Sequence, residues 1–136
     1  MAGNCFPPDL QTTYITTSGT IFIGSDLGNI YHSQDGGVSW DTATTNALDG
    51  ISDITFLSPT VGWAVGDDGL ILQSTDGGLT WTSVASGVTS NLESVFFANA
   101  STAYIAGRDG TILKSTNAGI SWTAQTSGTT NRLESV

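Results

Sequence analysis

Carboxylates are the most abundant side chains in this sequence that could do chemistry. The 136 residues contain 12 Asp and Glu against three Lys and Arg and a single His. Asp67 and Asp68 are adjacent, and paired carboxylates could serve as the acid and base of a glycosidase or as ligands of a calcium ion. The pair directly precedes Gly69, however, in a turn sequence where Asp is favoured because it hydrogen-bonds its own backbone. We therefore predict a turn here and no catalytic or metal site.

Other kinds of catalytic site have little support. A Ser or Cys nucleophile needs a positioned base, and no signature surrounds the only histidine, His32, which we interpret as a strand residue with a polar tip. The single cysteine, Cys5, excludes an internal disulfide framework and a Cys-based zinc cluster. The glycines do not form a P-loop or a dinucleotide-binding motif. The sequence thus predicts no enzyme, no cofactor and no metal.

The charge balance narrows the classes of partner. The net charge is -9, although only 11% of the residues are charged. Binding of nucleic acid or of an anionic membrane surface depends on Lys and Arg, so both partners are disfavoured. A cationic partner is compatible, but a solvated acidic surface is the simpler interpretation. No run approaches the ~18 apolar residues of a membrane span, residues 1–8 lack the features of a secretory signal, and the compartment stays open.

The positions of these residues follow an internal repeat. Three eight-residue segments match each other at a constant spacing of 41 residues: Ser33–Trp40, Ser74–Trp81 and Ser115–Trp122. Flanking positions keep the same register, namely Phe22, Trp63 and Tyr104; Ile30, Ile71 and Ile112; and Leu10, Ile51, Leu92 and Leu133. A fixed period of this length indicates a repeat architecture.

Each repeat resolves into short strands. In the second unit we expect strands over 51–57, 62–66, 70–74 and 81–85, with a hairpin turn at 67–69 that requires positive φ. Four strands in 41 residues, rich in β-branched and aromatic residues and punctuated by glycine, are typical of a β-propeller blade. No segment shows helical periodicity, so the predicted class is all-β. The predicted units are an N-terminal segment, 1–9, three blades, 10–50, 51–91 and 92–132, and the first strand of a fourth blade, 133–136.

We interpret the eight-residue motif as structural, forming the turn between the third and fourth strands of each blade. Its Asp can accept hydrogen bonds from its own turn, its Gly supplies positive φ, and its Trp buries a large ring between blades. The carboxylates lie a whole blade apart, which disfavours joint catalysis or metal binding. The predicted structural residues are Ser33, Asp35, Gly37 and Trp40; Ser74, Asp76, Gly78 and Trp81; and Ser115, Asn117, Gly119 and Trp122.

The motif, S-x-D-x-G-x-[ST]-W, is similar to the Asp box, or BNR repeat, of sialidases, sortilin-type receptors and related propellers. The fuller unit, with Leu92–Phe97 and then Gly107–Gly110 before the box, resembles the photosystem II assembly/stability factor family of cyanobacteria and chloroplasts, and also uncharacterised bacterial and phage repeat proteins. The resemblance extends over residues 10–136. It implies a propeller fold but little about function, since Asp boxes occur in enzymes, receptors and scaffolds. The third copy departs from the pattern at Asn117 and Ala118.

A sialidase activity is excluded by residue count. That site needs three arginines and a Tyr nucleophile, whereas this chain has only Arg108 and Arg132, and its tyrosines occupy repeat positions filled elsewhere by core-type residues. In the assembly-factor family, basic residues at the Gly-Arg position contribute to a partner-binding patch. Only Arg108 retains that residue here, because its equivalents are Asp26 and Asp67.

A ligand is expected on the face opposite the Asp boxes. There the loops between the second and third strands meet the loops that join one blade to the next, and loops on a rigid scaffold commonly carry recognition. The predicted binding residues are Asp26, Asp49, Asp67, Asp68, Asn91, Arg108, Asp109, Asn131 and Arg132, with Asn46 beside them.

Three blades are too few to close a ring, because propellers close with about four to eight blades. We therefore expect a homo-oligomer, such as two chains in a six-bladed ring, or a place in a larger assembly. The predicted function is a non-enzymatic protein-binding or assembly module. The alternative is a structural subunit of a larger particle, such as a phage or envelope component, whose blades neighbouring chains complete. Carbohydrate binding ranks lower, because the predicted binding loops contain no aromatic residue.

Overall fold

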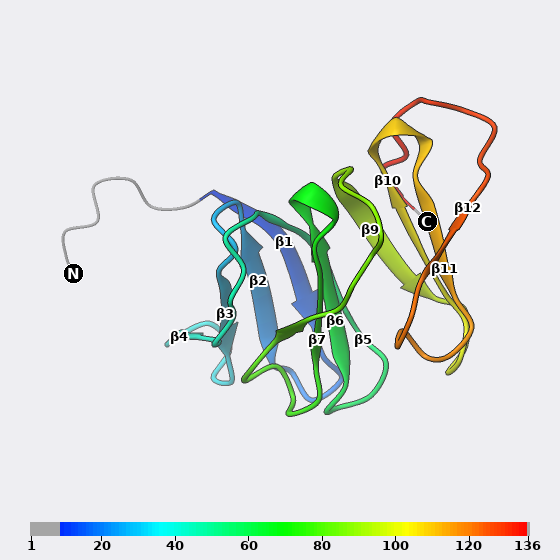
Figure 1. Ribbon diagram of the computed structural model, residues 1–136. Helices are drawn as coiled ribbons and strands as arrows, with labels where there is room; N and C mark the ends of the chain where they lie inside the picture. The colour runs from blue at the N-terminus through cyan, green and yellow to red at the C-terminus, as the bar shows by residue number, and fades with distance from the viewer. Residues whose placement is uncertain (1–8, 136) are drawn as a thin grey trace.

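The computed structural model describes residues 9–135 and contains three four-stranded antiparallel sheets standing side by side (Figure 1). Cys5 and Val136 lie outside the described residues, and so does the segment 1–8, in which the sequence predicted no secretory signal. Each sheet has the strand order of a propeller blade, with consecutive strands as neighbours. The predicted all-β propeller class is therefore confirmed.

The strands recur at the same positions of each repeat. Blade 1 consists of β1 (Leu10–Ile15), β2 (Ile21–Ser25), β3 (Ile30–Ser33) and β4 (Asp41–Thr42). Blade 2 consists of β5 (Ile51–Phe56), β6 (Gly62–Gly66), β7 (Ile71–Ser74) and β8 (Thr82–Ser83). Blade 3 consists of β9 (Leu92–Phe97), β10 (Ala103–Gly107), β11 (Ile112–Ser115) and β12 (Thr123–Gln125). Two single 3-10 turns, η1 (Asp67–Gly69) and η2 (Arg108–Gly110), follow the second strands of blades 2 and 3.

The outermost strand is shorter than expected. The sequence predicted a strand over 81–85, but β8 holds only Thr82 and Ser83. Trp81 precedes it because its backbone N–H donates to the carbonyl oxygen of Thr44 in blade 1, at 2.9 Å, and so leaves the ladder of its own blade. The predicted hairpin turn is the 3-10 turn η1, in which Asp68 has φ 55° and Gly69 has φ 76°.

The core lies between the blades. Side chains of a strand alternate between its two faces, and in β6 this alternation serves both neighbours. Ala64 packs into the apolar cluster shared with blade 1, whereas Trp63 and Val65 pack into the cluster shared with blade 3. All five residues of β6 are consequently buried. A blade of this kind can bury its apolar residues only against its neighbours.

The innermost strands line up along the interior side of the three blades. β5 lies against β1 on one side and against β9 on the other, as the middle of Figure 1 shows. Asp53 on β5 links two of these strands, because its carboxylate accepts hydrogen bonds from the backbone N–H groups of Ile54, at 3.0 Å, and of Val95 on β9, at 2.9 Å. Burial raises the pKa of this carboxyl above its usual value, against those two hydrogen bonds.

Among residues 9–135, no helix is long and apolar enough to cross a membrane. No group of three or more His, Cys, Asp or Glu side chains in the same range could hold a metal ion.

Candidate binding site

The candidate site begins at irregularities in the three innermost strands. The pairing registers of β1, β5 and β9 each skip one residue near the start of the strand. The residues left out of the ladder are Gln11, Ser52 and Glu93, which stand 41 residues apart. Bulges of this kind redirect a side chain away from the regular face of a sheet. All three residues line the same pocket at one end of the blades.

Turns and inter-blade loops complete that pocket. The residue that opens each turn after the second strand donates its backbone N–H to the carbonyl oxygen of the residue directly before the inner strand of the same blade: Asp26 to Asp9 at 2.9 Å, Asp67 to Gly50 at 2.9 Å, and Arg108 to Asn91 at 2.8 Å. These bonds hold each turn against the start of its own inner strand. The pocket measures about 190 Å³, and its lining residues are Gln11, Asp26, Gly50, Ile51, Ser52, Asp67, Asn91, Glu93, Arg108 and Arg132.

One carboxylate in the pocket is held by two arginines. Glu93 Oε1 accepts a hydrogen bond from Arg108 Nε at 3.0 Å, and Glu93 Oε2 accepts one from Arg132 Nη2 at 3.1 Å. The Glu93 side chain is 12% exposed, whereas both arginine side chains are 49% exposed. A guanidinium has five N–H donors, so both arginines retain donors on the solvent side. Arg132 Nε also lies 3.4 Å from Glu134 Oε1.

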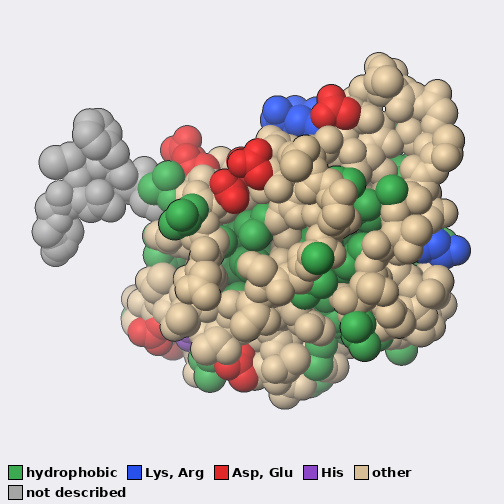
Figure 2. Space-filling view, viewed as in Figure 1, with side chains coloured by type: hydrophobic (Ala, Val, Ile, Leu, Met, Phe, Trp, Pro, Cys, Tyr) green, Lys and Arg blue, Asp and Glu red, His purple; other side chains and the backbone are tan. Residues whose placement is uncertain are grey.

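The other half of the pocket is acidic. Burial raises the pKa of the Asp67 carboxyl above its usual value; the charge of Arg108 opposes this shift, and the nearby carboxylates of Glu93, Asp68 and Asp49 add to it. Asp26 accepts a hydrogen bond from the backbone N–H of Asp9 at 2.9 Å. Figure 2 shows acidic side chains above blades 1 and 2, and a basic group beside an acidic one near the upper end of β9. The pocket therefore offers a negative and a positive half side by side.

The structure gathers only part of the predicted binding set. Five predicted residues line the pocket: Asp26, Asp67, Asn91, Arg108 and Arg132. Asp49, Asp68, Asp109 and Asn131 lie outside it, in neighbouring turns and loops. There the backbone N–H of Asp68 donates to Asn91 Oδ1 at 2.9 Å, and Ser90 donates to Asp109 at 3.1 Å. Asn46 is exposed and also outside the pocket.

Sequence reasoning missed Gln11, Ser52 and Glu93. These residues fall inside predicted strands, where a polar side chain is expected to face solvent, and a bulge leaves no clear mark in the residue types. A signal was nevertheless present, because all three occupy one repeat position, directly after the apolar residues Leu10, Ile51 and Leu92 that recur at the 41-residue spacing.

The Asp boxes lie at the opposite end of the blades. In blade 2 the carboxylate of Asp76 accepts from the Thr80 hydroxyl and from the backbone N–H groups of Thr80, at 3.0 Å, and Leu79, at 3.1 Å. The Thr80 hydroxyl, followed by the backbone bond, lowers the pKa of Asp76 to about 2. Ser39 does the same for Asp35, whose pKa is also about 2. Neither carboxylate lines the charged pocket.

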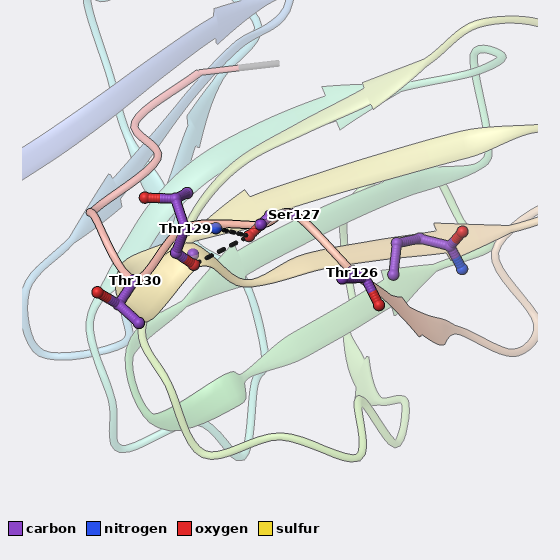
Figure 3. A pocket seen from close by; sticks show the side chains of 7 residues that line it. Thr126, Ser127, Thr129 and Thr130 are labelled. Carbon is purple, nitrogen blue, oxygen red and sulfur yellow. Dashed lines mark hydrogen bonds between the residues drawn. The ribbon is translucent and has the colours of Figure 1, made fainter.

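The remaining sites offer less chemistry. His32 is buried on β3 beside the Phe22 ring, with ring centroids 6.0 Å apart. A shallow hollow on blade 3 is lined by Gly110 and by the 125–130 segment. In its close-up, Ser127 hydrogen-bonds the backbone of Thr129 (Figure 3). Since this hollow contains hydroxyl and amide groups but no charged side chain, the mixed-charge pocket is the stronger candidate.

Comparisons with known proteins agree with this architecture. A family model described as photosynthesis system II assembly factor YCF48 matches residues 40–130. A solved structure described as YCF48 bound to D1 peptide is 26% identical, with a TM-score of 0.69, over 81% of this chain and 37% of that chain. YCF48 from Cyanidioschyzon merolae is 22% identical, with a TM-score of 0.69, over 88% of this chain and 38% of that chain, and shows the fold alone. The chain thus spans less than two fifths of each of these structures. No curated protein matches it in sequence.

Proposed function

Because the chain belongs to the family of photosynthesis system II assembly factor YCF48, we propose that it is a non-enzymatic protein-binding module. It would hold a peptide segment of its partner on the loop face, which is the end of the blades opposite the Asp boxes. The observation that carries this proposal is the pocket built from three bulge residues and the adjoining turns, in which acidic and basic groups lie side by side.

The chemistry of the pocket favours recognition over catalysis. Within its lining the ionisable side chains are carboxylates and two arginines, and Glu93 is held by both arginines. No histidine belongs to this lining to activate the hydroxyl of Ser52, and the Glu93 carboxylate is already paired with two arginines. Fixed charges around a small hollow instead provide specificity for a charged segment.

A peptide is the partner class that fits best. A similar protein has been solved bound to a D1 peptide, and we propose that this chain binds a ligand of the same kind. The repeat position that carries Arg108 holds Asp67 and Asp26 in the other blades. The preferred segment should therefore carry a carboxylate or polar group toward the arginines and a basic side chain toward Asp26 and Asp67.

A binding titration tests this proposal. The fluorescently labelled D1 peptide serves as the first probe, followed by a series of mixed-charge peptides. Arg108→Gln and Asp67→Asn should each weaken the best binder by about tenfold, the loss of one good polar contact of ~1.4 kcal/mol. Asp76→Asn is the matched control, because this carboxylate lies in an Asp box and should leave affinity unchanged. Equal affinity for the wild type and both pocket variants would exclude this site.

The predicted blade boundaries, 10–50, 51–91 and 92–132, are part of the same proposal, since each unit would contribute one turn and one bulge residue to the loop face. Homo-oligomerisation stays a prediction from the sequence and concerns surfaces other than this pocket.

A further inference from the structure

Apart from Ile51, the residues that line the pocket on the loop face come from three positions of the repeat. These positions are the bulge of the inner strand, the start of the turn after the second strand, and the end of the loop that follows the blade. Only in blade 3 do they combine opposite charges. The three sets are Gln11, Asp26 and Gly50 in blade 1; Ser52, Asp67 and Asn91 in blade 2; and Glu93, Arg108 and Arg132 in blade 3.

The fold does not depend on the charges of blade 3. The bulge occurs in all three inner strands. The backbone hydrogen bond that holds the turn against the inner strand is 2.9 Å long at Asp26 and at Asp67, and 2.8 Å long at Arg108. Blades 1 and 2 form both features with an uncharged bulge residue, Gln11 or Ser52. A role at the pocket therefore explains the charged set of blade 3 better than a role in folding.

The backbone of blade 3 fixes where the two arginine side chains begin, but not where they end. The N–H of Arg108 donates to the residue just before the inner strand, and the N–H that follows Arg132 donates to the residue just before Arg108. Both arginine side chains are long and 49% exposed, and without a partner such a side chain samples many rotamers. Glu93 removes this freedom, because each of its carboxylate oxygens accepts from one guanidinium.

The hydrogen bond to Glu93 leaves a defined edge of Arg108 free. Arg108 uses its Nε, and within residues 9–135 neither of its Nη atoms donates to a protein group. The N–H groups of the two Nη atoms form a fork that matches the two oxygens of a planar carboxylate. Arg132 directs Nη2 at Glu93 and Nε at Glu134. Its charge therefore offsets the negative charge of Glu93, which would otherwise stand unopposed beside a bound carboxylate.

We propose that Glu93 is a positioning residue, which holds Arg108 so that its two Nη groups bind one carboxylate of the partner peptide, while Arg132 neutralises Glu93. This inference rests on the proposed function and adds the residue that makes the basic half of the pocket selective for a carboxylate. Two arginines and one glutamate leave a single net positive charge, which one carboxylate neutralises. That carboxylate can belong to an acidic side chain or to the end of a chain, and peptides amidated at either place distinguish the two.

Fluorescence titration with matched peptides tests the proposal. The probe is the mixed-charge peptide that binds the wild type most tightly, with two versions in which either its acidic side chain or its C-terminus is an amide. The wild type should bind the version that lacks the recognised carboxylate about tenfold more weakly, through the loss of charge-assisted hydrogen bonds. Glu93→Gln should bind the intact peptide about fivefold more weakly, because Arg108 regains rotamer freedom, and should discriminate less between carboxylate and amide.

The sign of this change separates positioning from simple charge repulsion. Because Glu93 is negative, repulsion alone would make its removal strengthen the binding of a carboxylate. Glu134→Gln is the matched control, since it removes the same charge from beside the same arginine. Glu134 is 70% exposed and outside the pocket lining, so the affinity should stay within about twofold. Glu93→Gln should melt like the wild type, because blade 1 already carries glutamine at this position, Gln11.

Equal or tighter binding of the intact peptide by Glu93→Gln would overturn the proposal. An equal loss for the intact and the amidated peptides would overturn it as well, because Glu93 would then act on something other than the free edge of Arg108. Arg132→Gln is an independent test: it should weaken the intact peptide and leave the version without the recognised carboxylate unchanged. Losses in Arg108→Gln and Asp67→Asn without a loss in Glu93→Gln would contradict the positioning role alone, whereas wild-type affinity in those two variants would contradict the proposed function.

Discussion

The Asp boxes of blades 2 and 3 have the same backbone shape but different connections to their surroundings. In blade 2, Trp81 Nε1 donates to the Gly78 carbonyl at 3.0 Å, and the backbone N–H of Trp81 donates to Thr44 of the neighbouring blade. In blade 3, Trp122 Nε1 is buried without a partner, and no bond joins Trp122 to blade 2 among the described backbone contacts.

The polar contacts inside the two turns, in contrast, are nearly unchanged. Ser74 donates to Asp76 at 2.8 Å, and Ser115 donates to Asn117 at 2.9 Å. One hydrogen bond reverses its direction, because Thr80 donates to the Asp76 carboxylate whereas the Asn117 amide donates to Ser121. The turn of the box is therefore a local structure that tolerates substitution, and its coupling to the neighbouring blade is a separate property.

Replacing the box tryptophans should separate these two properties most strongly. Trp81→Ala removes a ring that is 2% exposed, and should lower the free energy of unfolding by about 3–5 kcal/mol, the cost of deleting a buried aromatic side chain. Trp122→Ala should cost less, because Trp122 is only half-buried and lacks the Nε1 bond. Urea denaturation of both variants measures the difference. Equal losses would show that the burial of the ring in its blade junction does not matter.

The box carboxylate should have a smaller, pH-dependent effect. Asp76→Ala should lower the free energy of unfolding by about 1 kcal/mol at neutral pH, a value reduced for the solvent exposure of the carboxylate. The folded-state pKa of Asp76, about 2, lies below the usual 3.8. Its contribution is therefore present above about pH 4 and is lost as the pH falls through about 2. Denaturation series from pH 5 to pH 2 should show the wild type and Asp76→Ala converging.

Asn117 provides the control for that titration. It makes the corresponding turn contacts, including acceptance from the Ser121 backbone N–H at 3.0 Å, but its amide does not ionise in this range. Asn117→Ala should therefore lower stability by an amount that stays constant between pH 5 and pH 2. Convergence of this variant with the wild type at low pH would assign the acid effect to other carboxylates.

The smallest expected effect concerns Ala118. This residue has φ 61°, where blade 2 has Gly77 at φ 76°, and a left-handed backbone is unfavourable for a residue with a Cβ atom. Ala118→Gly should therefore raise the free energy of unfolding by about 1 kcal/mol or less. The reciprocal variant, Gly77→Ala, should lower the free energy of unfolding by a similar amount. The cost comes from the backbone alone, because the new Cβ would meet only the Pro59 carbonyl oxygen, at an ordinary 3.5 Å. A destabilised Ala118→Gly chain would contradict the assignment of strain to this turn.

Much of the fold could be predicted from the sequence, because each residue type that the blade needs at a given position recurs in all three repeats. The position shared by Phe22, Trp63 and Tyr104 is always aromatic, and a box always ends in Trp. The degree of burial could not be predicted in the same way. Trp40 and Trp81 end boxes of closely similar sequence but are 40% and 2% exposed, since burial depends on whether another blade packs against the ring.

The candidate site was less predictable. Asp26, Asp67 and Arg108 could be placed together, because they occupy one turn position in successive blades. The link from Glu93 to Arg108 and Arg132 depends on a bulge, and a skipped register is a property of strand pairing that residue types do not reveal. The phage or envelope alternative stays a prediction from the sequence.

The bulges of the inner strands have a consequence for how this site could change over generations. Gln11, Ser52 and Glu93 stand outside the ladder of hydrogen bonds, and the fold accepts an amide, a hydroxyl and a carboxylate there. Selection for a new ligand can therefore act on one codon per blade while selection for folding acts on the residues on either side. Tandem duplication of a blade would add one such position to the ring each time, so an ancestral repeat could acquire a heterogeneous recognition surface without redesigning its framework.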